Sequence, residues 1–129
     1  YQKLAQYYNL SKRILFLSVR EDAISILKAS DIVVMSSNFE GFGLAAVEGM
    51  AAGKPVIASD VEGLSNIVEG AGLLFEPHNE KDLAAKIRLL MEDQLFYKSV
   101  SEKCKQRSEK CDVSVMGNRY NQLYQSLCR

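Results

Sequence analysis

The sequence predicts an α/β domain in which helices cover both faces of a parallel β-sheet. Short runs that are apolar throughout, such as residues 32–35, alternate with segments of helical spacing. Such runs are typical of parallel strands, because helices bury both faces of the sheet. Seven of the eight glycines lie between Gly41 and Gly72, so the tightest turns, and with them a candidate site, are expected mid-chain.

Four strands are expected, each a short apolar run. They span residues 13–18, 32–35, 56–58 and 72–75. Two helices are expected between them, because apolar residues there recur three or four positions apart. These helices cover residues 22–29 and 43–52, and Gly53 is placed to end the second.

From Asn79 onward the chain is expected to be helical. Asn79 and Asp82 have the spacing of a capping box at the start of the first helix. A second helix is expected over residues 98–110, and Asp112 is placed to cap a third. Apolar stripes at helical spacing predict core-facing sides, made of Leu83, Ile87, Leu90 and Met91 in the first helix and of Val113, Met116, Tyr120, Leu123, Tyr124 and Leu127 in the third.

Composition limits the function. The 129 residues are 47% apolar and 25% charged, the balance of one globular domain. Sixteen basic residues match sixteen acidic ones, which disfavours a general nucleic-acid binder. No apolar run approaches the roughly 20 residues of a membrane span. Three cysteines without a CxxC motif, and the single His78, predict reduced thiols and a cytoplasmic protein with neither a zinc site nor a disulfide framework.

The ends of the chain carry two further indications. The sequence starts at Tyr1, and Leu4, Tyr7 and Tyr8 already have the spacing of an apolar helix face, so we expect residues 1–129 to be one domain from a longer protein. Residues 80–129 carry a basic excess of three. A solvated helical surface explains this excess better than contact with a membrane, which remains the alternative.

Residues 36–59 contain the candidate site, with the order strand, glycine turn, helix, glycine stop and strand. In an open parallel sheet, ligands bind beyond the carboxyl ends of strands. Gly41 and Gly43 allow the backbone to approach a ligand closely. The N–H groups of Phe42, Gly43, Leu44 and Ala45 are then expected to be free, and together with the helix dipole they suit a diphosphate.

Two carboxylates flank this turn. Glu40 lies in the turn, and Glu48 lies about one helical turn inside, where side chains lean back toward the helix start. Carboxylates repel phosphate but accept hydrogen bonds from sugar hydroxyls, so a nucleotide-sugar fits the whole arrangement. The alternative is structural: Glu40 caps the helix, and Glu48 is only a good helix former.

Glu40-Gly41-Phe42-Gly43 is followed by Glu48, with seven residues between the two glutamates, and then by Met50-Ala51-Ala52-Gly53-Lys54-Pro55-Val56-Ile57-Ala58. This motif resembles the signature of the retaining glycosyltransferases of family 4. The similarity covers most of the chain. Further matches to the family pattern are Phe16-Leu17, Ala29-Ser30-Asp31-Ile32, Ser36 with Ser37, and Gly72-Leu73-Leu74.

The resemblance implies a GT-B enzyme, of which this chain is the Rossmann-like, donor-binding C-terminal domain, ending in helices. It implies that Glu40 contacts the donor sugar of a UDP- or GDP-sugar, that Glu48 holds the ribose, and that the amides around Phe42 to Ala45 bind sugar and phosphate. Val19 and Arg20 would lie near the base. The family needs no metal in this domain and retains the anomeric configuration. The basic pair that grips the diphosphate and the acceptor-binding domain would lie upstream.

This sequence departs from the family pattern at Ser18, Gly49 and Asn66, which stand where Gly, Ala and Glu are common. The expected role is sugar transfer in polysaccharide, glycolipid or glycoconjugate biosynthesis, in the cytoplasm or at the inner face of a membrane. The fragment alone is expected to be inactive. The alternatives are an epimerase or a catalytically silent nucleotide-sugar-binding module of the same fold, and a phospho-acceptor signalling domain, which the absence of an Asp at the end of residues 32–35 disfavours.

Overall fold

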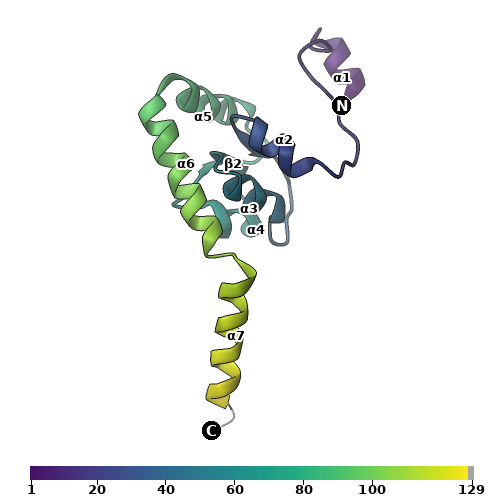
Figure 1. Cartoon of the computed structure of the whole chain (residues 1–129). Helices are drawn as coiled ribbons and strands as arrows, with labels where there is room; N and C mark the ends of the chain where they lie inside the picture. The colour runs from purple at the N-terminus through teal and green to yellow at the C-terminus, as the bar shows by residue number, and fades with distance from the viewer. Residues whose placement is uncertain (128–129) are drawn as a thin grey trace.

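The computed structural model describes residues 1–127 and contains a three-stranded parallel sheet (Figure 1). The strands β1 (Val33–Met35), β2 (Val56–Ser59) and β3 (Leu73–Phe75) lie in that order. Val33 pairs with Val56, and Ile57 pairs with Leu73. All four residues of the central strand β2 are buried, as expected of a parallel strand between two helical layers. The predicted α/β fold class is confirmed.

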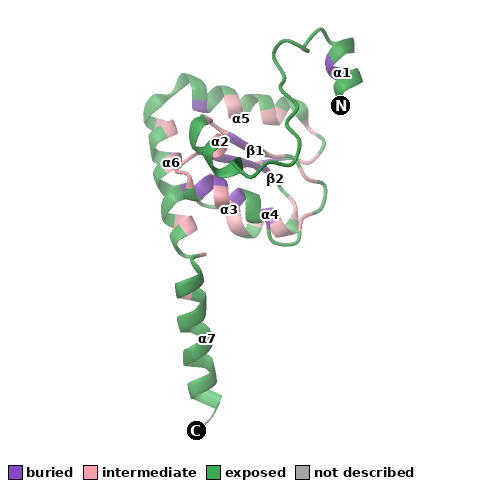
Figure 2. Ribbon diagram, turned by 45° about the vertical axis from the view of Figure 1, so that its right-hand side comes forward, coloured by how far each residue is buried: buried purple, intermediate pink, exposed green. Residues whose placement is uncertain are grey.

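Helices cover both faces of the sheet (Figures 1 and 2). α3 and α4 lie on one face and α5 on the other, while α6 packs along α3 and α5. The bounds of the helices are α1 Gln2–Tyr7, α2 Ala23–Ala29, α3 Leu44–Ala51, α4 Glu62–Val68, α5 Glu80–Glu92, α6 Gln94–Glu109 and α7 Val113–Leu127.

α3 is held directly against the sheet by a glycine. A Cβ atom at Gly49 would lie 3.0 Å from both Cγ atoms of Val33, so the helix backbone sits on β1 at this position. This contact explains a glycine inside a helix, which otherwise costs about 1 kcal/mol relative to Ala. The helix ends as predicted at Gly53, which has a φ of 73°. The Gly53 N–H donates to the Met50 carbonyl and the Lys54 N–H donates to the Gly49 carbonyl, which together form a Schellman motif.

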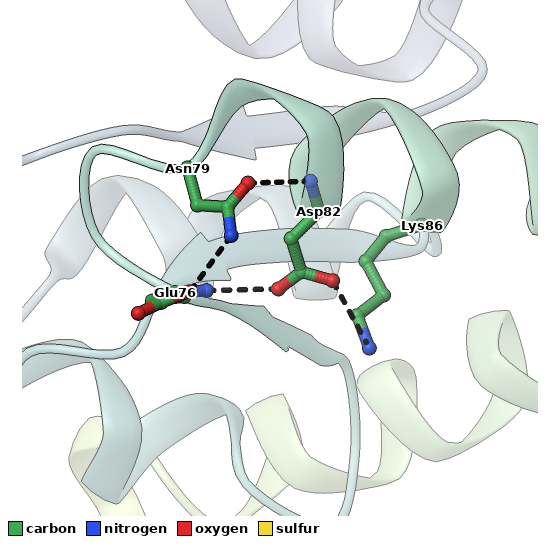
Figure 3. Close-up of polar contacts among 4 residues, drawn as sticks. All are labelled: Glu76, Asn79, Asp82 and Lys86. Carbon is green, nitrogen blue, oxygen red and sulfur yellow. Dashed lines mark hydrogen bonds and ion pairs between the residues drawn. The ribbon is translucent and has the colours of Figure 1, made fainter.

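The predicted cap of α5 is present (Figure 3). The Oδ1 atom of Asn79 accepts the Asp82 N–H at 3.0 Å. The Asp82 carboxylate does not reach back to Asn79; it accepts the N–H of Glu76 at 2.9 Å and lies 3.7 Å from the Lys86 ammonium. The first turn of α5 is thus attached to the chain that leaves β3.

α4 was not predicted from the sequence. It is seven residues long, carries a glycine at its second position, and has no side-chain cap at its start. Its C-terminal end is held by Arg107 of α6, which donates to the carbonyl oxygens of Asn66 (3.3 Å), Ile67 (3.3 Å) and Glu69 (2.8 Å). Because these contacts come from 40 residues away, local sequence gives little sign of the helix.

Three expectations are wrong. Met91 of the predicted core-facing stripe of α5 is 67% exposed, whereas Leu83, Ile87 and Leu90 of that stripe pack in or against the core. Residues 13–18 form no strand: they are exposed, and in the described chain no strand pairs with them. An apolar run alone does not make a strand, because its backbone groups need a hydrogen-bonded neighbour. The apolar stripe of α7 is not in the core; α7 projects from the domain, and its residues are almost all exposed (Figure 2).

The helix expected over residues 98–110 starts earlier, at Gln94, because Asp93 accepts the N–H of Phe96 at 2.9 Å and caps it. Asp112 accepts the N–H of Ser114 at 2.8 Å and so caps α7, as predicted. Cys104 is buried and Cys111 half-buried, both as free thiols, and Cys128 lies outside the described residues.

Candidate functional site

The loop between β1 and α3 lies at the carboxyl end of the sheet, where the sequence placed the site. Ser59, the last residue of β2, is 2% exposed, and its hydroxyl donates to the carbonyl of Ser37 at 2.5 Å. This bond ties the loop that carries Glu40 to the most deeply buried strand. The loop therefore starts from a fixed point.

α3 begins without a side-chain cap. Its N-cap residue is Gly43, whose φ of 78° lies in the left-handed region that glycine adopts easily. A Cβ there would also come within 2.8 Å of Leu64 on α4. The N–H groups of Ala46 and Val47 bond back to the Gly43 carbonyl, whereas those of Leu44 and Ala45 meet no acceptor in the described chain. Two exposed residues thus present free N–H groups at the positive end of a helix.

Glu40 does not cap α3. Within the described part of the chain, its Oε1 atom accepts only the N–H of the next residue, Gly41, at 3.2 Å. The capping alternative for Glu40 is therefore not what the structure contains. The carboxylate is half-buried and leaves the N–H groups at the helix start uncovered.

Glu48 is half-buried on α3. It lies four residues after Leu44 and three after Ala45, on the same side of the helix. Helical side chains in general lean toward the N-terminus of their helix, which in α3 is the end where the free N–H groups lie. Glu40 thus belongs to the loop before α3, and Glu48 to the helix itself.

A cavity of about 490 Å³ opens beside Glu40. One wall is the loop, with Asn38, Phe39 and Gly41 next to Glu40, and the other is the first part of α4. The α4 wall consists of Val61, Glu62, Gly63 and Asn66. This lining carries two carboxylates and no cation, so it suits uncharged hydroxyl groups better than phosphate.

The cavity gathers some of the predicted site residues and not others. Glu40 and Gly41 line it, whereas Glu48 does not. Val19 and Arg20 also lie outside it, in the exposed segment before α2, where Arg20 forms an ion pair with Asp22 at 2.7 Å. The Arg20 guanidinium lowers the pKa of the Asp22 carboxyl. Of the α4 wall, the sequence pattern drew attention only to Asn66.

A second cavity, of about 510 Å³, lies at the opposite end of β1. Tyr97 lines it and donates from its hydroxyl to the carbonyl of Asp31 at 2.8 Å. Burial, and to a lesser degree the Asp31 charge, raise the pKa of Tyr97. Because parallel sheets bind ligands at the carboxyl ends of their strands, this cavity is a weaker candidate.

Residues 1–127 contain no group of three potential metal ligands and no helix long and apolar enough to cross a membrane.

Comparison with known proteins identifies the family. The family model described as "Glycosyl transferases group 1" matches residues 1–110. The chain belongs to this family. This group 1 assignment confirms the resemblance seen in the sequence, and the fold is that of a GT-B glycosyltransferase domain.

Two curated relatives illustrate the match. One is N,N'-diacetylbacillosaminyl-diphospho-undecaprenol alpha-1,3-N-acetylgalactosaminyltransferase of Campylobacter jejuni, 34% identical over 84% of this chain and 30% of the relative. Another is the D-inositol 3-phosphate glycosyltransferase of Corynebacterium jeikeium, 32% identical over 98% of this chain and 31% of the relative.

Solved structures agree. HepE of Anabaena, in complex with UDP, superimposes with a TM-score of 0.90 at 28% identity, covering 97% of this chain and 35% of HepE. Sucrose-phosphate synthase of Thermosynechococcus elongatus gives a TM-score of 0.85 at 32% identity, over 98% of this chain and 33% of that enzyme. The chain therefore spans about a third of the length of the group 1 proteins it matches.

Proposed function

We propose that this chain is the donor-binding domain of a glycosyltransferase that transfers a sugar from a nucleotide-sugar to an acceptor. The observation that carries the proposal is the start of α3, where the N–H groups of Leu44 and Ala45 meet no acceptor in the described chain, with Glu40 in the loop before them and Glu48 on the helix after them. An anion-binding helix end beside hydroxyl-accepting groups fits a diphosphate joined to sugars on both sides.

The chemistry follows from the charges. When the bond between sugar and diphosphate breaks, negative charge grows on the leaving phosphate. The free N–H groups and the α3 dipole stabilise that charge without reorganising. The cavity beside Glu40 holds no cation in its lining, so the phosphates belong at the helix start and the sugar hydroxyls belong near Glu40.

The roles of the site residues in the proposal are those the family pattern implies. Glu40 accepts hydroxyl hydrogen bonds from the transferred sugar and orients its anomeric carbon. Glu48 binds the ribose hydroxyls. The backbone of residues 41–45 binds the sugar and the distal phosphate, and Val19 with Arg20 contacts the base.

We extend the proposal to substrate and setting. A UDP-sugar is supported by HepE, which was crystallised with UDP and with UDP-glucose, and a GDP-sugar is the alternative donor. A polysaccharide, glycolipid or glycoconjugate acceptor is supported by the Campylobacter relative, whose name specifies a diphospho-undecaprenol. Transfer with retention, in the cytoplasm or at the inner face of a membrane, completes the proposal.

The test uses the full-length enzyme and a panel of UDP- and GDP-sugars. Thermal-shift titration identifies the donor, and turnover is then compared for Glu40→Ala, Glu48→Ala and Glu92→Ala, the last an exposed carboxylate on α5. We expect Glu40→Ala to lose at least about 100-fold in kcat, in line with other transition-state contacts. Glu48→Ala should mainly weaken donor binding, and Glu92→Ala should behave as wild type.

Two results would contradict the proposal. If both Glu40→Ala and Glu48→Ala keep wild-type turnover, the assigned roles are wrong. If the donor binds and no sugar reaches an acceptor, a catalytically silent module replaces the transferase; a changed sugar epimer in the recovered donor identifies an epimerase.

A further inference from the structure

The first turn of α4 lies against the backbone of the Glu40 loop. A Cβ atom at Gly63 would fall 1.9 Å from the carbonyl oxygen of Glu40, 2.7 Å from its carbonyl carbon and 3.0 Å from the carbonyl oxygen of Gly41. All three atoms belong to the backbone, so no side-chain rotation can relieve the overlap. The hydrogen at Gly63 is therefore what permits the present position of the Glu40–Gly41 peptide.

The next residue of α4 makes a second contact with the same loop. Leu64 is fully buried, and its Cδ2 atom lies 2.8 Å from where a Cβ of Gly43 would be. Gly63 thus faces the beginning of the glycine turn, while Leu64 faces its end. The turn that carries Glu40 rests on α4 at both ends.

We propose that Gly63 is a positioning residue for the transfer reaction and acts through Glu40. The inference rests on the proposed function, since it assumes that Glu40 contacts the transferred sugar. Gly63 also lines the cavity of about 490 Å³ beside Glu40, so the same close approach fixes the distance between the two walls of that cavity.

The size of the effect follows from the overlap. Carbon and oxygen atoms without a covalent bond are in contact at roughly 3.3 Å, so a methyl group at position 63 requires a displacement of roughly 1.4 Å from the 1.9 Å approach. Asn38, Phe39 and Gly41 are exposed, so the loop can move outward while the core stays in place. A misplacement of about 1 Å can cost about 100-fold in rate.

The experiment compares Gly63→Ala with Val68→Ala in the full-length enzyme. Val68 is fully buried on the same helix and distant in sequence from the loop, so shortening it lowers stability without pushing on Glu40. We expect Gly63→Ala to lose about 100-fold in kcat while its Kd for UDP stays within about twofold of wild type. Val68→Ala should lower Tm and retain kcat.

A double variant tests whether Gly63 works through Glu40. In the Glu40→Ala background, adding Gly63→Ala should reduce kcat little further, because the group being positioned is already absent. Losses that multiply would overturn the proposal. The proposal would also be overturned if Gly63→Ala had wild-type turnover, or if it lost UDP affinity in parallel with kcat. A Gly63→Ala variant that does not fold would overturn it as well, because the overlap would then be relieved in the core and not in the loop.

A readout independent of transfer separates this inference from the proposed function. In enzyme labelled with ¹⁵N-glycine, Gly63→Ala should shift the amide resonances of Gly41 and Gly43 and leave that of Gly53 in place. Unchanged Gly41 and Gly43 resonances refute the positioning role even in an active enzyme. If no sugar is transferred by wild type, the proposed function fails, and the amide shifts still decide whether Gly63 sets the loop.

Discussion

Arg107 is predicted to stabilise the domain by holding the end of α4. Arg107 is half-buried, and its guanidinium donates to three carbonyl oxygens at the helix end, one at 2.8 Å and two at 3.3 Å, that accept from no other group in residues 1–127. A well-formed charge-assisted hydrogen bond contributes about 1.5 kcal/mol or more to stability. The two longer hydrogen bonds, together with the interaction of the charge with the helix dipole, add roughly 0.5–1 kcal/mol. Arg107→Ala should therefore cost about 2 kcal/mol.

Urea unfolding measures this cost. With an m-value of about 2 kcal/mol/M, the midpoint should fall by about 1 M. Lys103→Ala is the matched control, because Lys103 is exposed on the same helix. Arg107→Lys should fall between the two, since an ammonium keeps the charge but cannot reach three carbonyls with the planar geometry of a guanidinium. A midpoint for Arg107→Ala within about 0.2 M of wild type would show that Arg107 does not stabilise the end of α4.

Four more predictions concern the glycine turn, the cap of α5 and the two described cysteines. Gly43→Ala should cost about 2 kcal/mol in urea unfolding, because alanine is disfavoured at a φ of 78° and its Cβ would press on Leu64; unchanged stability would contradict the geometry. Asn79→Ala should cost about 1 kcal/mol through the lost cap, and Asn79→Ser should restore most of it. In the native protein, Cys111 should react with a thiol reagent well before the buried Cys104, and equal rates would contradict the burial of Cys104. Burial also raises the pKa of the Cys104 thiol above the usual value of 9.0. The contribution of Cys104 to stability is therefore complete below pH 9.0 and is lost as the pH rises from there through the folded-state pKa. Cys104→Ala should remove this pH dependence.

Local chemistry made much of the fold predictable. Gly53 ends α3 and Asn79 begins α5 because each residue acts on its immediate neighbours. The strands β1 and β2 could be predicted because each contains an uninterrupted apolar run, which is typical of strands in a parallel sheet covered by helices. The candidate site followed from the same local order, a strand, a glycine turn and a helix start.

Features that depend on distant parts of the chain could not be predicted. Residues 13–18 have the composition of a strand, but no neighbour pairs with them in the described chain. The end of α4 is hydrogen-bonded to Arg107 of a distant helix, and α4 in turn forms one wall of the cavity beside Glu40. A glutamate before a helix has the same sequence spacing whether or not it caps the helix, so only the structure could reject the capping role of Glu40.

The contact between Gly49 and Val33 constrains how this domain can change. A methyl group at position 49 would touch both branches of the valine, so the side chains at positions 33 and 49 cannot both become larger. Evolution and laboratory libraries alike must therefore treat them as a pair, with a larger residue at 49 accommodated by a smaller one at 33. A library that randomises α3 alone would tilt the helix off its strand and displace the helix start at which we propose that the donor binds, so attempts to change the proposed donor are better directed at the loop.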